Sequence, residues 1–303
     1  MVSALPESQP TKKPYWLKVK LPSHRNFFYV SDTLKKERLN TICQSAKCPN
    51  VAECWSQKTA TFLILGDICT RGCAFCAVEK GVPSPPFPDE PAHVAEAVSL
   101  FGLRYAVITS VTRDDLSDGG ASFFAETITA IKNRTTGVKV EVLIPDFKGD
   151  AKALEQVSRA QPDILNHNLE TTERLYPLIN RPRENYHRSL DVLKKAKEMG
   201  NVTKSGLMIG LGEKKEEIIR SLSDLREASC DLLTIGQYLQ PSKMHAPVRK
   251  YYTPLEFEHL KGIALDFGFK DVESGPLVRS SYKAHKMYNS LQEKIKGIEE
   301  CVI

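Results

Sequence analysis

A loop with three closely spaced cysteines constrains this chain more than any other feature of its sequence. Cys69, Cys73 and Cys76 are spaced C-x3-C-x2-C and follow a short apolar run at residues 61–65 that predicts a strand. A closed zinc site takes four ligands, and a ferredoxin-type cluster takes four thiolates. Because no fourth cysteine is near, the loop suits three corners of a cubane 4Fe–4S cluster, with one iron left free to bind another molecule. A zinc knuckle or scattered buried thiols is the competing interpretation.

Three further cysteines form a second group ahead of the first. Cys43, Cys48 and Cys54 are spaced C-x4-C-x5-C, and again no fourth cysteine is close. A structural zinc site does not explain a second three-thiolate group in one chain. Of the two cysteines that remain, Cys230 precedes an apolar strand and is expected to pack as a small hydrophobe. No role is expected for Cys301.

Length and composition are those of a globular protein. The 303 residues suit an α/β barrel, and 41% hydrophobic with 26% charged residues is ordinary. The net charge of +5 is spread along the chain, so no nucleic acid is expected as a partner. No apolar run approaches the ~20 residues of a membrane span, and the polar start lacks a secretion signal. Eight cysteines without such a signal indicate metal binding in a reducing cytoplasm.

Apolar runs and helical patterns alternate regularly after the cysteine loop. No hairpin signal separates them, so the pattern predicts a parallel sheet made of right-handed crossovers. Six strand–helix units are fewer than the eight of a closed barrel, and we expect an α/β fold, an incomplete (β/α)6 TIM-type barrel. Strands are expected at residues 61–65, 105–111, 138–144, 163–170, 206–210 and 232–236, and helices at 34–42, 94–101, 121–134, 151–159, 190–199, 214–228 and 254–267, followed by a short strand at 271–274 and a last helix.

Polar and glycine residues gather where the expected strands end. Active sites of such barrels lie at the C-terminal ends of the strands, which form the barrel mouth. The sequence therefore predicts a catalytic site at the mouth. The residues expected there are the cysteine loop, residues 113–120, Pro145, Asp146, and residues 166–170, 210–213 and 237–240.

Two resemblances follow from these motifs. The C-x3-C-x2-C loop, with Phe75 before the third cysteine, resembles the signature of the radical S-adenosylmethionine (SAM) superfamily. The two cysteine triplets and the quartet Arg279-Ser280-Ser281-Tyr282, in this order, resemble the lipoyl synthase family. By itself the quartet would indicate only a serine that caps the last helix. The resemblance runs from about residue 13 to about residue 285 and includes residues 13–17, 112–116, 166–171, 206–213 and 233–241.

The resemblance implies a reaction and its cofactors. Two sulfur atoms are inserted at C6 and C8 of an octanoyl chain that is amide-linked to a lysine of a carrier protein. The family uses SAM and two 4Fe–4S clusters, one that generates 5′-deoxyadenosyl radicals from SAM and an auxiliary one that donates sulfur. An unactivated C–H bond is too strong for a side-chain acid or base, which agrees with radical chemistry.

The resemblance also implies roles for single residues. The auxiliary cluster would take a serine of the quartet as a weak fourth ligand, Ser281 with Ser280 as the alternative, and Arg279 would stabilise its negative charge. The implied cysteine ligands are Cys69, Cys73 and Cys76 for the SAM cluster and Cys43, Cys48 and Cys54 for the auxiliary cluster.

Contacts to SAM are implied at the barrel mouth. Asn168 and Glu170 suit ribose hydroxyls, the backbone of residues 119–120 suits the methionine part, and residues 210–213 suit the adenine. Tight barrel turns explain the glycines equally well, and His167 fits a core histidine as well as a ligand. The expected contact residues are Phe75, Gly119, Gly120, Asn168, Glu170, Gly210 and Glu213.

Three parts of the chain are expected. Residues 1–58 form an N-terminal extension with the auxiliary cysteines, residues 59–253 the barrel, and residues 254–303 a C-terminal extension with the quartet; both extensions are expected to cover the mouth.

Expected partners are an octanoylated carrier (the glycine cleavage H protein or the lipoyl domain of a 2-oxoacid dehydrogenase E2), an electron donor such as flavodoxin or ferredoxin, and an iron–sulfur cluster carrier. We expect a monomer without membrane contact. Competing interpretations are another radical sulfur inserter, such as a methylthiotransferase or a biotin synthase relative, a non-catalytic iron–sulfur carrier, and a zinc protein.

Overall fold

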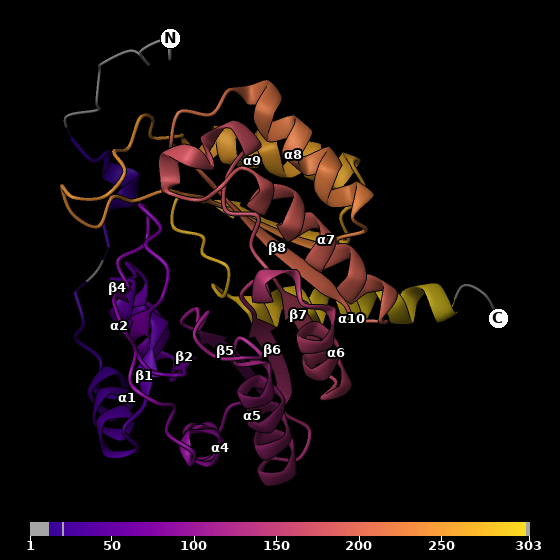
Figure 1. Ribbon diagram of the computed structural model, residues 1–303. Helices are drawn as coiled ribbons and strands as arrows, with labels where there is room; N and C mark the ends of the chain where they lie inside the picture. Colours follow the sequence, from indigo (N-terminus) through magenta and orange to yellow (C-terminus); the bar gives the residue numbers. More distant parts are fainter. Residues whose placement is uncertain (1–11, 20, 301–303) are drawn as a thin grey trace.

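The computed structural model describes residues 12–19 and 21–300 and contains one large sheet (Figure 1). The prediction for Cys301 lies outside the described residues. Strands β3 (Ile68–Cys69) and β4 (Glu79–Lys80) form a separate ribbon around the cysteine loop. The strands of the large sheet, in their spatial order, are β1 (Asn40–Thr41), β2 (Thr61–Ile64), β5 (Tyr105–Ser110), β6 (Lys139–Leu143), β7 (Ile164–Asn166), β8 (Thr203–Ile209), β9 (Leu232–Gln237) and β10 (Asp271–Gly275).

The central strands confirm the predicted partial barrel. From β2 through β5 to β9, neighbours in the sheet follow chain order and pair in parallel. Strand β10 adds a further parallel partner to β9. Strand β1 pairs with β2 in the antiparallel sense, which the alternating pattern did not predict. Because β1 and β10 stand at opposite ends of the sheet, the barrel is open between them in the described part of the chain.

The helices that follow the barrel strands cover the outer side of the sheet, as right-handed crossovers require (Figure 1). Phe62 of β2, for example, stacks on Phe101 of the following helix with ring centroids 6.3 Å apart. Local signals fix the ends of these helices, such as Gly102 with φ 65° after α4 and a capping box between Thr253 and Glu256 at α9. The helices are α1 (Arg25–Lys36), α2 (Ile42–Ser45), α3 (Val51–Ser56), α4 (Glu90–Phe101), α5 (Ala121–Arg134), α6 (Ala151–Arg159), α7 (Glu184–Glu198), α8 (Lys215–Glu227), α9 (Pro254–Asp266) and α10 (Ala284–Glu300).

Among the described residues, no helix combines the length and the apolar character that a membrane crossing requires.

The inner side of the barrel is polar, in contrast to the apolar outer side. Lys204 and Glu141 are fully buried and form an ion pair of 2.9 Å. The Glu141 carboxylate also accepts hydrogen bonds from Tyr105, at 2.6 Å, and from Asn166, at 3.0 Å. A buried ion pair tolerates the loss of water only when further hydrogen bonds complete it, as they do here. Buried polar side chains are therefore found inside the barrel as well as at its mouth.

The C-terminal extension differs from its expected place over the mouth. The apolar side chains of α10 pack on the first residues of the barrel strands, where Met287 and Leu291 meet Ile164 and Leu232 in one buried cluster. These strand starts lie at the end opposite the mouth. The apolar face of the helix covers the apolar floor of the barrel, and this burial explains why the extension lies there.

The predicted helix at residues 34–42 is wrong. Helix α1 ends at Lys36, and Arg38 then adopts a left-handed conformation with φ 55°. The chain turns there, extends as β1 and enters α2 at Ile42. Leu34 and Leu39 are both buried, as their spacing indicated, but a chain reversal brings them together instead of a helix face.

Candidate active site: two thiol pockets in one barrel

The cysteine loop, residues 69–76, lies at the barrel mouth. Its first cysteine ends β3, and β4 pairs with β3 in parallel beyond the loop. Cys69, Cys73 and Cys76 line a cavity of about 540 Å³, here named the mouth pocket. The other walls come from α2, the loop after β3, the ends of β5, β6 and β7, and the loop after β9, through Ile42, Phe75, Thr109, Leu143, Pro145, His167, Asn168, Glu170, Arg181, Met244 and His245.

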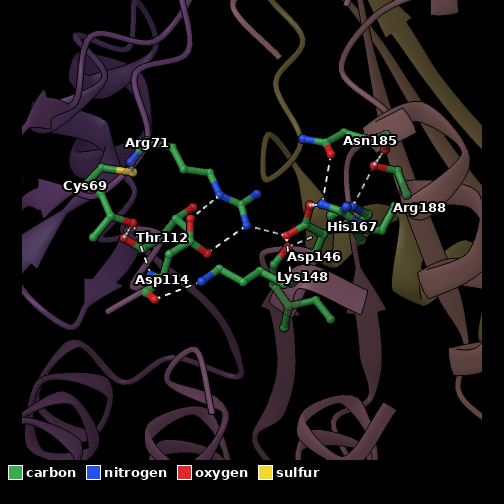
Figure 2. Close-up of polar contacts among 12 residues, drawn as sticks. Cys69, Arg71, Thr112, Asp114, Asp146, Lys148, His167, Asn185 and Arg188 are labelled. Atoms are coloured by element: carbon green, nitrogen blue, oxygen red, sulfur yellow. Dashed lines mark hydrogen bonds and ion pairs between the residues drawn. The ribbon is translucent and has the colours of Figure 1, made fainter. Parts of the chain in front are cut away.

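Arg71 anchors the cysteine loop to the barrel (Figure 2). Its guanidinium donates two hydrogen bonds to Asp114, at 2.7 and 2.8 Å, and one to Asp146 at 2.7 Å. The Asp146 side chain is fully buried, and Arg188 lies 3.5 Å from its other oxygen. Burial alone would raise the pKa of Asp146, but the hydrogen bond and the charge of Arg71 hold it well below its usual range. Charge-assisted hydrogen bonds thus fix the loop.

Backbone contacts hold the same loop from two other elements. The Ala74 N–H donates to Ile179 O at 2.9 Å, and Ala74 O accepts from the Ala246 N–H at 2.8 Å. His245 Nε2 lies 3.0 Å from Cys76 O. The loop after β9 therefore closes over the cysteines, which the spacing of the cysteines could not reveal.

Three polar side chains beyond β7 face the mouth pocket: Asn168, Glu170 and Arg181. Burial raises the pKa of Glu170, while the charge of Arg181 and a hydrogen bond from Asn168 oppose the rise. Arg181 is buried, and its Nε and Nη1 have no hydrogen-bond partner among the described residues. A buried guanidinium with free donors at a cavity wall is suited to bind a carboxylate. The sequence pattern assigned no role to Arg181, because a single arginine carries no recognisable spacing.

His167 is a buried, neutral histidine in the wall of the mouth pocket. Its Nδ1 lies 2.9 Å from Ile144 O and its Nε2 3.0 Å from Ser189 Oγ. A carbonyl oxygen only accepts, so Nδ1 of the neutral ring carries the hydrogen, and the Ser189 hydroxyl that faces Nε2 also lies 2.9 Å from Asn185 O. Burial lowers the pKa of His167 from 6.5 to about 4. The interpretation as a satisfied core histidine agrees with these contacts.

Gly119 and Gly120 lie apart from the mouth pocket, in contrast to the expected contact with methionine. The Gly119 N–H donates to Leu116 O at 3.1 Å, and the Gly120 N–H to Asp118 Oδ1 at 2.9 Å. Gly120, with φ 90°, precedes α5 and packs against Leu65. Both amides are already used within their own turn, so these glycines start the helix and have no free donor for a ligand.

Gly210 and Glu213 also lie outside the lining of the mouth pocket. The Glu213 carboxylate accepts hydrogen bonds from the backbone of Gly210, at 2.6 Å, and of Leu211, at 2.9 Å. It also accepts a bond of 2.9 Å from Tyr252. The glycine carries a positive φ of 110° next to Gln237. This group stabilises the turn after β8, and an apolar cluster that includes Leu211, Tyr238 and Val248 fills the mouth on that side.

The second cysteine group lines another cavity of about 550 Å³, here named the auxiliary pocket. Cys43, Cys48 and Cys54 share it with Arg279 and Ser281 of the quartet, as the sequence motifs predicted. The side chain of Asn50, between the cysteines, donates to Leu277 O at 2.7 Å and ties the two chain ends together. Thr61, Tyr105 and Lys139 also line the pocket, so it lies toward the N-terminal ends of the strands and not over the mouth.

The two serines of the quartet contact residues of different pockets. Ser281 Oγ accepts a hydrogen bond of 2.9 Å from Thr61 and lines the auxiliary pocket. Ser280 Oγ donates to Asn168 Oδ1 at 2.8 Å, and Asn168 lines the mouth pocket. The geometry therefore favours Ser281 over Ser280 as the serine that accompanies the auxiliary cysteines.

The two pockets are close neighbours along the inner wall. On β5, Val107 lines the auxiliary pocket and Thr109 the mouth pocket. Side chains two residues apart on one face of a strand are separated by about 7 Å. The consecutive residues Ile42 and Cys43 divide between the pockets in the same way. A molecule bound between the pockets can therefore touch both.

The donor atoms of both pockets are of the type that binds iron–sulfur clusters. Thiolates are the usual ligands of such clusters. Burial raises the pKa of Cys43 to about 11 and that of Cys54 and Cys76 to about 12. Without a cation the thiols are neutral, and bound iron supplies the positive charge that a buried thiolate needs. In the described part of the chain, no three His, Cys, Asp or Glu side chains are grouped closely enough for a single metal ion.

Comparisons with known proteins agree with this geometry. The radical SAM superfamily matches residues 63–225. The lipoyl synthase of Rubrobacter xylanophilus is 54% identical over 276 residues, 90% of this chain and 86% of the relative, and that of Caldicellulosiruptor bescii is 55% identical over 275 residues, 90% and 94% of the two chains. The crystal structure of Streptococcus suis SuiB bound to S-adenosylmethionine shares the fold, with a TM-score of 0.53 and 13% identity over 72% of this chain and 50% of that one. The chain belongs to the lipoyl synthase family of the radical SAM superfamily.

Proposed function

We propose that the protein makes the lipoyl group by inserting two sulfur atoms at C6 and C8 of an octanoyl chain bound to a lysine of a carrier protein. One observation carries this proposal: two pockets with three thiols each adjoin along the inner face of β5. A single acyl chain must present its C–H bonds to a hydrogen-abstracting centre and its carbons to a sulfur source. Adjacent pockets satisfy both demands for one bound chain.

The cofactors of this function are SAM and two 4Fe–4S clusters. When bound, the first cluster supplies the electron that cleaves SAM, and the second supplies the inserted sulfur. Cys69, Cys73 and Cys76 would hold the first cluster. Their role is supported by the rigid anchoring of the loop through Arg71, which keeps three thiols oriented toward one cavity.

Residues of the mouth pocket would bind SAM around the first cluster. Asn168 and Glu170 offer an amide and a carboxylate to the ribose hydroxyls. Arg181, with free buried donors beside Glu170, would bind the carboxylate of the methionine part. Phe75 lies in the wall between the cysteines and would exclude water from the nucleotide.

Residues of the auxiliary pocket would hold the second cluster. Cys43, Cys48 and Cys54 would supply thiolates and Ser281 a hydroxyl oxygen. A hydroxyl is a weaker ligand for iron than a thiolate, which suits a cluster that loses sulfur during each turnover. Arg279 is close enough to influence Cys48 electrostatically and would stabilise the negative charge of the cluster.

The proposal extends to domains, partners and location. Residues 1–58 and 254–303 would act as the two extensions that enclose the auxiliary cluster, and residues 59–253 as the catalytic barrel. The substrate would be an octanoylated glycine cleavage H protein or E2 lipoyl domain, with flavodoxin or ferredoxin as electron donor and a separate carrier that restores the cluster.

All seven described cysteines are free thiols, which supports a reducing compartment, the cytoplasm. We propose a monomer, testable by light scattering.

Mass spectrometry of an octanoyl-lysyl peptide tests the proposal. The peptide is incubated anaerobically with the reconstituted protein, a strong reductant and SAM. We expect a gain of two sulfurs per peptide as the dithiol, and a further loss of two hydrogens when the dithiol is oxidised to the cyclic disulfide before measurement. Replacing Cys43, Cys48 and Cys54 by alanine should abolish sulfur insertion while 5′-deoxyadenosine still forms, and replacing Cys69, Cys73 and Cys76 should abolish both.

Two results would contradict the proposal in different ways. If 5′-deoxyadenosine forms but the intact protein adds no sulfur, the radical chemistry is right and the substrate is wrong. If the triplet of Cys43, Cys48 and Cys54 can be removed without loss of sulfur insertion, the auxiliary pocket is not the sulfur source.

A further inference from the structure

The segment that leads into the quartet lies against β8 and β9 where two glycines leave room for it. A Cβ atom on Gly206 of β8 would lie 2.6 Å from Asn168 Oδ1 and 2.9 Å from Ser280 Oγ. A Cβ atom on Gly236 of β9 would collide with Val278 O. Real Cβ atoms do not approach so closely, so a side chain at position 206 would push the Asn168 and Ser280 side chains apart, and one at position 236 would displace the backbone at Val278. The two strands are shaped to admit this segment.

Consecutive residues of the quartet bind opposite parts of the barrel. Ser280 donates to Asn168 in the mouth pocket, and Ser281 accepts from Thr61 beside the auxiliary cysteines. A shift of the peptide between the two serines therefore moves both contacts. A short, directly bonded connection of this kind is a physical route for coupling between two sites.

The bond from Ser280 also determines how Asn168 presents its amide. Because Asn168 Oδ1 accepts from Ser280, the NH₂ group is left to donate on the other side. Glu170 lines the same pocket two residues further on, and Asn168 lowers its pKa against the effect of burial. Ser280 thus orients the pair of side chains that would meet the ribose hydroxyls.

We propose that Ser280 is a positioning residue that couples nucleotide binding in the mouth pocket to the placement of Ser281 in the auxiliary pocket. The identity of the two ligands rests on the proposed function. A nucleotide that engages Asn168 and Glu170 holds the Ser280 bond in place, and this bond keeps Ser281 against the auxiliary cysteines. By reciprocity, a cluster that binds Ser281 favours the orientation of Asn168 that binds the nucleotide. A bound nucleotide therefore favours retention of the weak serine ligand in the auxiliary pocket.

Hydrogen–deuterium exchange of the reconstituted holoenzyme tests the coupling without turnover. S-adenosylhomocysteine, which is not cleaved, is added as the probe. We expect it to slow exchange in peptides that span residues 277–284 of the unchanged protein. In Ser280→Ala this protection should be lost, and the affinity for the probe should fall roughly threefold to tenfold, the effect of one lost hydrogen bond.

A matched control and a second variant make the result decisive. Ser274→Ala removes another half-buried serine hydroxyl of the C-terminal extension, one that donates to Phe257 O at 2.8 Å and touches neither pocket. It should keep both the protection and the affinity. Gly206→Ala keeps every hydroxyl but separates Ser280 from Asn168, so it should reproduce the loss, and it decides the matter if Ser280→Ala does not fold.

Activity gives an independent measure of the same coupling. With the octanoyl peptide, Ser280→Ala should form more 5′-deoxyadenosine per sulfur inserted than the unchanged protein. If both variants retain protection and affinity, the coupling is refuted. If the unchanged protein shows the protection but inserts no sulfur, the proposed function fails and the coupling stands.

Discussion

The mouth pocket and the auxiliary pocket hold the same number of thiols but are built in opposite ways. The mouth thiols come from one stretch of eight residues that the Arg71 ion pairs and several backbone bonds fasten to the barrel. The auxiliary thiols lie on α2, α3 and the turn between them, and residues near the other end of the chain close the pocket. Two neutral hydrogen bonds join the chain around this pocket to residues near its other end, one from Asn50 to Leu277 O and one from Thr61 of β2 to Ser281. An exposed bond of 3.1 Å from Tyr282 to the Glu53 carboxylate adds a third connection.

The difference matches the different demands on the two sites. A cluster that only passes electrons is reused, and a rigid loop with charge-assisted bonds keeps it in place. A cluster that gives up sulfur must be rebuilt, so its pocket has to open. Each neutral hydrogen bond contributes only about 1 kcal/mol, and the two chain ends can therefore separate locally without unfolding the barrel.

The largest expected effect comes from breaking the anchor of the mouth loop. Arg71→Ala leaves the buried carboxylate of Asp146 without its main partner, and we expect a loss of about 4 kcal/mol in the free energy of unfolding. Arg279→Met at the auxiliary pocket should change it by less than about 1 kcal/mol, because Arg279 forms no ion pair with a carboxylate among the described residues. Urea unfolding under anaerobic conditions measures both values.

A surface ion pair provides the control for this comparison. Arg159 pairs with Glu155 on the exposed face of α6 at 2.7 Å. Arg159→Ala should cost no more than about 0.5 kcal/mol. Equal midpoints for Arg71→Ala and the unchanged protein would show that the ion pairs do not anchor the loop, and a large loss in Arg279→Met would remove the contrast between the pockets.

A residue of the mouth pocket, His167, should also cause much of the pH dependence of stability. The buried His167 has its pKa lowered to about 4, whereas in the unfolded chain it takes up a proton near pH 6.5. The unfolded state binds the extra proton between these values, so stability is complete above pH 6.5 and falls as the pH drops toward 4, by about 3 kcal/mol. Measured from pH 7 to 4, the difference in unfolding free energy between the unchanged protein and His167→Gln isolates this contribution.

His285 in the auxiliary pocket supplies the matched comparison. Burial lowers its pKa as well, but the side chain is half-exposed and solvent screens the effect. His285→Gln should leave the pH profile nearly unchanged. A flat profile for the unchanged protein, or the same change in both variants, would contradict the assignment to His167.

The barrel could be predicted from the sequence because its signals are local. Continuous β-prone runs such as residues 105–110 and amphipathic helices such as residues 121–134 and 151–159 can be recognised from a short stretch of sequence. Strand β1 could not be predicted, since two residues carry no periodic pattern and their pairing with β2 follows a chain reversal at Arg38. The position of α10 could not be predicted either, because it depends on which apolar surface the folded barrel leaves uncovered.

The candidate site could be predicted where spacing carries information and not where contact across the fold decides. The cysteine triplets were found from spacing and the quartet from the family resemblance, and the structure places Ser281 in the pocket that the auxiliary cysteines line. Arg181 was missed, because the lack of a partner for a buried guanidinium exists only in three dimensions. The glycines at residues 119, 120 and 210 were expected to meet the nucleotide, but their amides are used within their own turns.

The smallest effects should come from two asparagines that make the same bond at the two pockets. The side-chain nitrogen of Asn50 donates to Leu277 O and that of Asn180 to Gly72 O, both at 2.7 Å. Asn50 is buried, so Asn50→Ala leaves a carbonyl without a partner and should cost about 1.5 kcal/mol. Asn180 is exposed with φ 57°, and Asn180→Gly, which keeps that conformation, should cost about 0.5 kcal/mol because water replaces the bond.

Iron release to a chelator, followed by absorbance, should be faster for Asn50→Ala than for Asn180→Gly. The opposite order would mean that the contact between the two chain ends does not control access to the auxiliary cluster. The pocket would then have to open between the chain ends and the barrel strands.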